Sequence, residues 1–182
     1  MSLIRALIFV CVAVNLVHSI PVIPYSYPLY KQCDPAWGNN TIITTTVCEV
    51  GCLMSSVSMS LAGKGIQVDG QLATPGTLNA WLKTNQGYTS NDELEEGVVA
   101  ELPAVQWVGP SIPGTSLSME DIAELLNQRV TVILNVLNGG HFVLCVGYDS
   151  DAQTLYVNDP GFQTIYYNYS DVVGYRIFKM NL

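Results

Sequence analysis

Apolar residues follow a helical spacing in the first half of the chain and gather in strand-like runs in the second half. The helical stretches are bounded by residues typical of helix ends, with Gly51 before one and Thr74-Pro75 at the start of another. The pattern predicts helices over residues 52–63, from residue 74 to Gly87, from about residue 91 onward, and over 119–128 after the capping residue Ser118.

The pattern becomes strand-like from residue 130. Apolar runs alternate there with turn signals such as Asn138-Gly139-Gly140. The predicted strands are residues 130–137, 141–148, 154–158, 165–169 and 175–178, in a meander. Residues 20–30 contain three Pro and are expected to be extended. Because helices come first and strands second, the order predicts an α+β domain with N-terminal helices packed on a C-terminal antiparallel β-sheet.

The first 19 residues have the features of a secretory signal peptide. Arg5 provides the positive charge, residues 6–17 are apolar, and Val17-His18-Ser19 offers small residues for cleavage. The apolar stretch is well short of the roughly 20 residues that span a bilayer. We therefore expect one secreted domain over residues 20–182, with a lysosome-like compartment as the alternative and no membrane contact after signal cleavage.

Composition restricts the classes of function. The 182 residues are 49% hydrophobic and 12% charged, with a mean hydropathy of +0.29, which excludes an intrinsically disordered chain. Seven Lys and Arg against 15 Asp and Glu give a net charge of −8 without a basic cluster, which argues against nucleic acid as a partner. Sequons at Asn39 and Asn168 predict glycosylation. We expect a monomer.

Signal cleavage would leave four cysteines and one histidine: Cys33, Cys48, Cys52, Cys145 and His141. Four cysteines in a secreted chain could form two disulfides, with three possible pairings. Cys52 has a distinctive setting, however, because it directly follows Gly51 at the predicted start of a helix. The unpaired N–H groups and positive end of a helix stabilise a thiolate. Any base for this thiol must be His141.

His141 and Asp159 stand at the ends of predicted strands. His141 follows Gly139-Gly140 at the start of one strand, and Asp159 follows the next strand along the chain. A satisfied core histidine and an ordinary Asn-Asp-Pro turn are the plainer interpretations. Alternatively, Asp159 could orient the imidazole as the third member of a triad. A cysteine at a helix start, then a histidine and an aspartate, is the chain order of papain-like peptidases.

Four segments together resemble the papain-like group of bacteriocin-leader-processing peptidases and their relatives, the C-thirty-nine-like family. They are residues 30–38 (YKQCDPAWG), 50–56 (VGCLMSS), 140–144 (GHFVL) and 157–160 (VNDP). The resemblance implies a papain-like fold and a peptide or protein substrate, with no metal or organic cofactor. It implies that Cys52 is the nucleophile, His141 the general base and then acid, Asp159 the orienting residue, and Gln32 the oxyanion donor together with the Cys52 backbone N–H.

The chain departs from the family pattern in two places. Gln32 and Cys52 are further apart than the tight Gln-to-Cys spacing of many papain-like enzymes, so residues 39–46 must loop out. Leu53 stands where relatives often have Gly. If Cys52 stays reduced as the resemblance implies, Cys33–Cys48 is the natural disulfide and Cys145 a buried thiol. Cys48 is the rival nucleophile.

The sequence thus favours a secreted cysteine peptidase that cleaves peptide or amide bonds through a Cys-His-Asp triad. An amidase or acyl-transferase with the same triad is a second hypothesis. A third is a catalytically inactive secreted binding domain that keeps the fold and uses two disulfides. The acidic run at residues 92–96 is interpreted as a solvated helix face.

Overall fold

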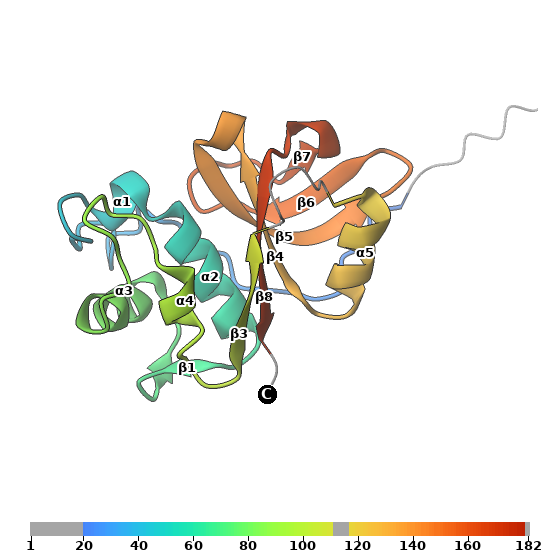
Figure 1. Cartoon of the computed structure of the whole chain (residues 1–182). Helices are drawn as coiled ribbons and strands as arrows, with labels where there is room; N and C mark the ends of the chain where they lie inside the picture. Colours follow the sequence, from blue (N-terminus) through green and yellow to red (C-terminus); the bar gives the residue numbers. More distant parts are fainter. Residues whose placement is uncertain (1–19, 111–116, 181–182) are drawn as a thin grey trace, which may run out of the picture.

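The computed structural model describes residues 20–110 and 117–180, so the predicted signal peptide lies outside the described residues. The fold is α+β, with a six-stranded antiparallel sheet beside a group of helices (Figure 1). Helices α1 to α4 lie on one side of the sheet in Figure 1, and α5 lies on the other. This arrangement agrees with the predicted papain-like architecture. No helix in the described ranges is long and apolar enough to cross a membrane.

The helices begin where the capping residues predicted. Thr74 and Ser118 each accept a hydrogen bond from the backbone N–H three residues later, at the starts of α3 and α5. Four serines and the apolar side chains of α2 are buried, because this helix runs between the sheet and the other helices. The helices are α1 Val47–Val50, α2 Cys52–Gly63, α3 Pro75–Thr84, α4 Glu96–Val99 and α5 Met119–Asn127.

The large sheet has the strand order β3-β8-β4-β5-β6-β7. Only β4 to β7 form the predicted meander, because the last strand crosses back to pair with β4 on the far side from β5. The strands are β3 Val105–Pro110, β4 Thr131–Val136, β5 His141–Asp149, β6 Thr154–Asn158, β7 Tyr166–Asn168 and β8 Gly174–Met180, with short 3-10 turns at Leu137–Gly139 (η1) and Tyr169–Asp171 (η2).

The sheet is buried on both faces. On β4, Ile133 packs into the core around α2 and α3, whereas Val132 and Leu134 pack into a second core against α5. A strand covered on both faces is expected to be continuously apolar rather than alternating. This double coverage explains the run Val-Ile-Leu at the middle of the sheet.

Several elements differ from the sequence prediction. Helix α3 ends at Thr84 rather than near Gly87, and α4 begins at Glu96 rather than near residue 91. Strand β3 was not predicted, because it pairs at the sheet edge with β8, far away in the chain. The small hairpin of β1 Gln67–Val68 and β2 Gln71–Leu72 was also missed, although the Asp-Gly turn between them is a hairpin signal.

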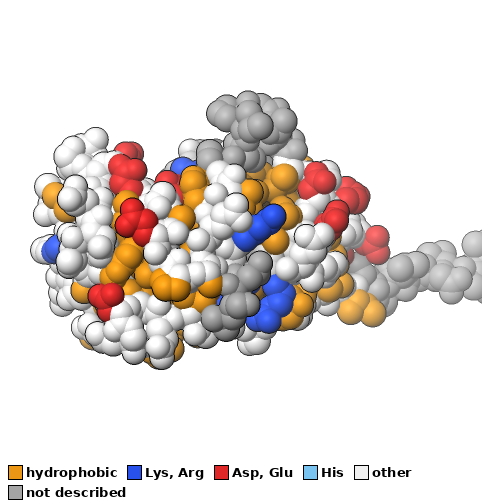
Figure 2. Space-filling view, turned by 60° about the horizontal axis from the view of Figure 1, so that its bottom comes forward, with side chains coloured by type: hydrophobic (Ala, Val, Ile, Leu, Met, Phe, Trp, Pro, Cys, Tyr) orange, Lys and Arg blue, Asp and Glu red, His pale blue; other side chains and the backbone are white. Residues whose placement is uncertain are grey.

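The N-terminal segment is extended, as its prolines predict, and is tied to the sheet. Val22 exchanges backbone hydrogen bonds with Tyr148 of β5, and the Asn158 side chain donates to the Tyr27 and Pro28 carbonyls. On the face drawn in Figure 2, the few Lys and Arg side chains lie apart from one another, among apolar and acidic ones.

Candidate active site

The thiol of Cys52 lies at a break between two helices. Helix α1 ends at Val50 and α2 begins with Cys52, with Gly51 between them. A side chain on Gly51 is excluded, because its Cβ would lie 2.4 Å from the Val47 carbonyl oxygen. In an uninterrupted helix the Cys52 N–H would pair with the Cys48 carbonyl. The break therefore frees a backbone donor beside the thiol.

Gln32 occupies the other side of this break. Its Nε2 donates to the Cys48 carbonyl at 2.7 Å, and its backbone N–H donates to the Pro160 carbonyl at 2.9 Å. The side chain is buried, and its Oε1 has no hydrogen-bond partner among the described residues. A primary amide has two N–H donors. One N–H thus fixes the side chain next to the start of α2, and the second is left for another acceptor.

His141 is the first residue of β5 and is 5% exposed. Its Nε2 lies 2.8 Å from Oδ1 of Asp159. Because the carboxylate can only accept, Nε2 carries the proton and the Nδ1 side of the ring is left for Cys52. The Phe162 ring contacts the imidazole edge-on, with a centroid distance of 5.0 Å. A side chain at Gly161 would come within 2.9 Å of the imidazole, so only glycine lets this turn approach the ring.

Asp159 directly follows β6 and is almost fully buried. Its Oδ1 accepts from His141 and from the backbone N–H groups of Gly161 and Phe162, at 2.8 to 2.9 Å. Burial by itself raises the pKa of this carboxyl. The hydrogen bonds from His141, Phe162 and Gly161 outweigh burial and hold the pKa below its ordinary value. Asp159 is therefore ionised at neutral pH.

The charge on Asp159 determines the protonation of His141. Desolvation lowers the pKa of the imidazole, but hydrogen bonds and charge interactions with Asp159 and Cys52 more than compensate and raise it to about 9. The imidazole ring is consequently a proton carrier held between a carboxylate and a thiol. This arrangement can take a proton from the thiol and deliver it to a leaving group.

The side chains of Cys52 and His141 face a groove. A cleft of about 530 Å³ on one side is lined by Gln32, Cys52, His141 and Phe162 among others. A second cleft of about 490 Å³ extends from Cys52 along Met54, Leu94 and Glu96. Cys52, Val50 and Phe142 line both clefts. Cys52 therefore stands between two hollows, and an extended chain could cross the thiol from one to the other.

The model of the Peptidase_C39 like family matches residues 25–179. The chain belongs to this family. Searches among curated proteins and among solved structures find no significant match. Membership points to a cysteine peptidase-like function and a peptide substrate. The matched range includes every residue that lines the groove described above.

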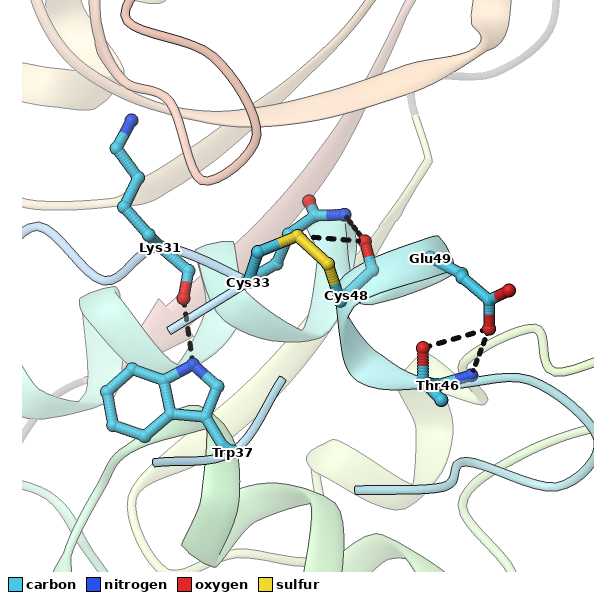
Figure 3. Close-up of a disulfide and its surroundings, with 7 residues drawn as sticks. Lys31, Cys33, Trp37, Thr46, Cys48 and Glu49 are labelled. Atoms are coloured by element: carbon cyan, nitrogen blue, oxygen red, sulfur yellow. Dashed lines mark hydrogen bonds between the residues drawn. A yellow bond between two sulfur atoms is a disulfide. The ribbon is translucent and has the colours of Figure 1, made fainter. Parts of the chain in front are cut away.

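In this member of the peptidase family, a disulfide and hydrogen bonds hold the segment that carries Gln32 in place. Cys33 and Cys48 form a disulfide with a Cα–Cα distance of 4.2 Å, which is the pairing that the resemblance implied. Figure 3 shows this disulfide beside the start of the helical region, with the indole of Trp37 donating to the Lys31 carbonyl. Cys52 and Cys145 are free, so the two-disulfide arrangement of the inactive binding-domain hypothesis is not seen.

We expect the double substitution Cys33→Ser with Cys48→Ser to lower the free energy of unfolding by about 3 kcal/mol. A disulfide that closes a loop of this length restricts the unfolded chain by roughly that amount. Urea unfolding of the two proteins measures the difference. The control is Cys145→Ser, which removes a thiol but leaves the disulfide intact. An unchanged midpoint for the double variant would show that the disulfide contributes no stability.

The remaining predicted residues lie in varied places. Cys145 is buried mid-strand, where burial raises the pKa of its thiol to about 12. Cys48 is oxidised in the disulfide, so it is not the free thiol of the rival hypothesis. Asn39 and Asn168 are both exposed, and their glycosylation stays a prediction. Among the described residues, no group of three or more His, Cys, Asp or Glu side chains could hold a metal ion.

The acidic run at residues 92–96 is not the solvated helix face that the sequence suggested. Asp92 is buried in a loop and accepts from the backbone N–H groups of Ile43 and Thr44, and from the Thr44 hydroxyl. These bonds hold the pKa of Asp92 well below its usual range. Glu96 pairs with Arg176 of β8. Asp92 therefore fixes the loop of residues 43–44 within the segment that the disulfide closes, and Glu96 lines one wall of the second cleft.

Two residues of the site were not found from the sequence. Lys31 donates from Nζ to the Asp159 carbonyl at 2.6 Å and to the Phe162 carbonyl, and so braces the turn that carries Asp159. The Tyr167 hydroxyl donates to Asp159 Oδ2 at 2.9 Å. The sequence offers no local signal for either contact, because Lys31 lies far from Asp159 along the chain and the Tyr167 contact depends on how β7 pairs with β6.

Proposed function

We propose that this protein is a secreted cysteine peptidase that hydrolyses peptide bonds through Cys52, His141 and Asp159. The observation that carries the proposal is the buried imidazole of His141, which is hydrogen-bonded to Asp159 on one side and interacts with Cys52 on the other. Family membership supports the peptidase class, and the groove across Cys52 supports an extended peptide as the substrate.

In the proposed reaction the proton of Cys52 already resides on His141, because the raised pKa of the imidazole keeps it protonated at neutral pH. The sulfur attacks the carbonyl carbon of the peptide, and the carbonyl oxygen becomes an oxyanion. The backbone N–H of Cys52 and the second N–H of Gln32 stabilise this oxygen, a type of contribution worth a few kcal/mol in transition-state energy. His141 then protonates the leaving amine, and the acyl group remains on sulfur as a thioester.

Water completes the cycle. His141, now neutral, accepts a proton from a water molecule that attacks the thioester, and the second oxyanion occupies the same pair of donors. Collapse of this intermediate releases the carboxylic acid and returns the thiol. Asp159 holds the imidazole in orientation through both halves of the cycle, and the raised pKa of His141 keeps it protonated for the amine-releasing step at neutral pH.

Secretion is part of the proposal. The Arg5-containing apolar leader, the Cys33–Cys48 disulfide and the two exposed sequons support an oxidising, secretory environment. An amidase or acyl-transferase would use the same residues and differ in the acceptor. Analysis of the products formed from peptides and from amide-containing fragments of the bacterial cell wall separates these activities.

Alkylation of the native protein tests the mechanism. We expect iodoacetamide at neutral pH to modify Cys52 rapidly and to leave Cys145 unmodified, because the first lines the groove and the second is buried. Peptide mapping identifies the modified residue, and the same map reports whether the secreted chain begins at Ile20. An unmodified Cys52, or Cys52 recovered in a disulfide, would contradict the proposed mechanism.

A further inference from the structure

Tyr167 of β7 lies behind the triad, on the side of Asp159 away from His141. Its hydroxyl donates to Oδ2 of Asp159 at 2.9 Å, whereas His141 bonds to Oδ1. Tyr167 is 8% exposed and packs in the core formed with α5. The register of β6 and β7 pairs Leu155 with Tyr167, which places this side chain on the face of the sheet below the Asp159 turn.

The four donors to the Asp159 carboxylate among the described residues are divided unequally between its oxygens. Oδ1 accepts from the imidazole and from two backbone N–H groups of the following turn, whereas Oδ2 accepts from Tyr167. The backbone donors lie within three residues of Asp159 and move with its turn. The imidazole and the tyrosine hydroxyl are anchored on the other strands β5 and β7, and together they fix the rotation of the carboxylate relative to the sheet, with His141 on Oδ1 and Tyr167 on Oδ2.

We propose that Tyr167 is a positioning residue for the triad, which keeps the Asp159 carboxylate ionised and its Oδ1 directed at the imidazole. The inference rests on the proposed peptidase function for its catalytic meaning. The hydroxyl stays a donor throughout the working range, since burial and the carboxylate raise the pKa of Tyr167 to about 12. Tyr167 acts through Asp159 and is not among the described residues that line the two clefts.

The groups that titrate around Asp159 come from three elements and one loop. They are His141 from β5, Tyr167 from β7, Cys52 from α2 through the imidazole, and the Lys31 ammonium, which bonds to the Asp159 main-chain carbonyl. A hydrogen bond to the ionised form of a carboxyl lowers its pKa. Loss of the tyrosine donor should therefore raise the pKa of Asp159 while the other three groups stay in place.

The test compares Tyr167→Phe with Tyr169→Phe. The control also loses one hydrogen-bonded phenol hydroxyl, since Tyr169 donates to the Leu117 carbonyl at 2.6 Å, but it does not touch Asp159. In Tyr167→Phe we expect the acidic limb of kcat/KM for a peptide amide to move up by about one pH unit, because one bond to a charged group is lost. In Tyr169→Phe the limb should stay in place.

Imidazole NMR titration supplies a readout that does not need activity. The His141 ring signals sense the protonation of Asp159, and they need no further assignment in the protein cleaved after Ser19, where His141 is the remaining histidine. We expect the acidic inflection of His141 to rise in Tyr167→Phe alone. If both tyrosine variants keep the inflection of the unsubstituted protein, or both shift it equally, Tyr167 does not position Asp159. If the inflection shifts without any measurable peptidase activity, the positioning contact stands and the proposed function fails.

Discussion

Cys52→Ala will abolish hydrolysis of peptide substrates, with kcat/KM lower by at least about 10³-fold. Removal of the nucleophile of a covalent triad leaves only what binding and oxyanion donors provide. The substitution removes one sulfur from a partly exposed position at the start of α2, so the fold should be retained. Initial rates on a fluorogenic peptide library, with circular dichroism of both proteins, measure the two effects.

Cys145→Ala is the matched control for this substitution. Cys145 is the other free thiol, but it lies in the core on the α5 side of the sheet. We expect this variant to keep its activity and its Cys52 alkylation, with a modest loss of stability from the small cavity. Retained activity in Cys52→Ala, or lost activity in a folded Cys145→Ala, would show that Cys52 is not the nucleophile.

Gln32→Ala will lower kcat for peptide hydrolysis by about 10² to 10³-fold, since removal of one preorganised oxyanion donor has an effect of this size. Gln32 Nε2 is held by the Cys48 carbonyl next to the first N–H of α2. The substitution removes the amide but leaves the thiol, the imidazole and the carboxylate unchanged. Steady-state kinetics on a single peptide amide separates kcat from KM.

Alkylation separates this role from a structural one. The reaction of a thiolate with iodoacetamide displaces iodide and forms no tetrahedral oxyanion. It should therefore proceed at a similar rate in Gln32→Ala and in the unsubstituted protein. If alkylation slows in parallel with hydrolysis, Gln32 supports the thiol or the local fold rather than the oxyanion.

The order of helices and strands follows from local patterns. Caps such as Thr74 and Ser118 are encoded within a few residues, and so is the change to strand periodicity at residue 130. Pairings between distant segments are not encoded in this way. Strand β8 could be located from its own residues, but its position between β3 and β4 depends on burial across both faces of the finished sheet.

In the candidate site, too, local patterns predict some features, and others depend on contacts between distant residues. A single histidine after residue 19, a glycine before Cys52 and an aspartate after a strand made Cys52, His141 and Asp159 candidates, and the family resemblance supplied their roles together with Gln32 and the disulfide. The sequence could not predict the hydrogen bonds of Asp92. Its partners lie almost fifty residues earlier, in a loop whose residues show no repeating pattern.

The sequence by itself singled out the residues that we propose carry the chemistry, because nucleophilic and basic side chains are scarce in this chain and stand at element ends that local patterns identify. Only the tertiary structure decided how that chemistry is held. The bond of Tyr167 to Asp159, the brace of Lys31 on the following turn and the hold of the Cys48 carbonyl on Gln32 each join segments that are separate along the chain. Such bonds depend on directions fixed by packing, which a local pattern of residues does not specify.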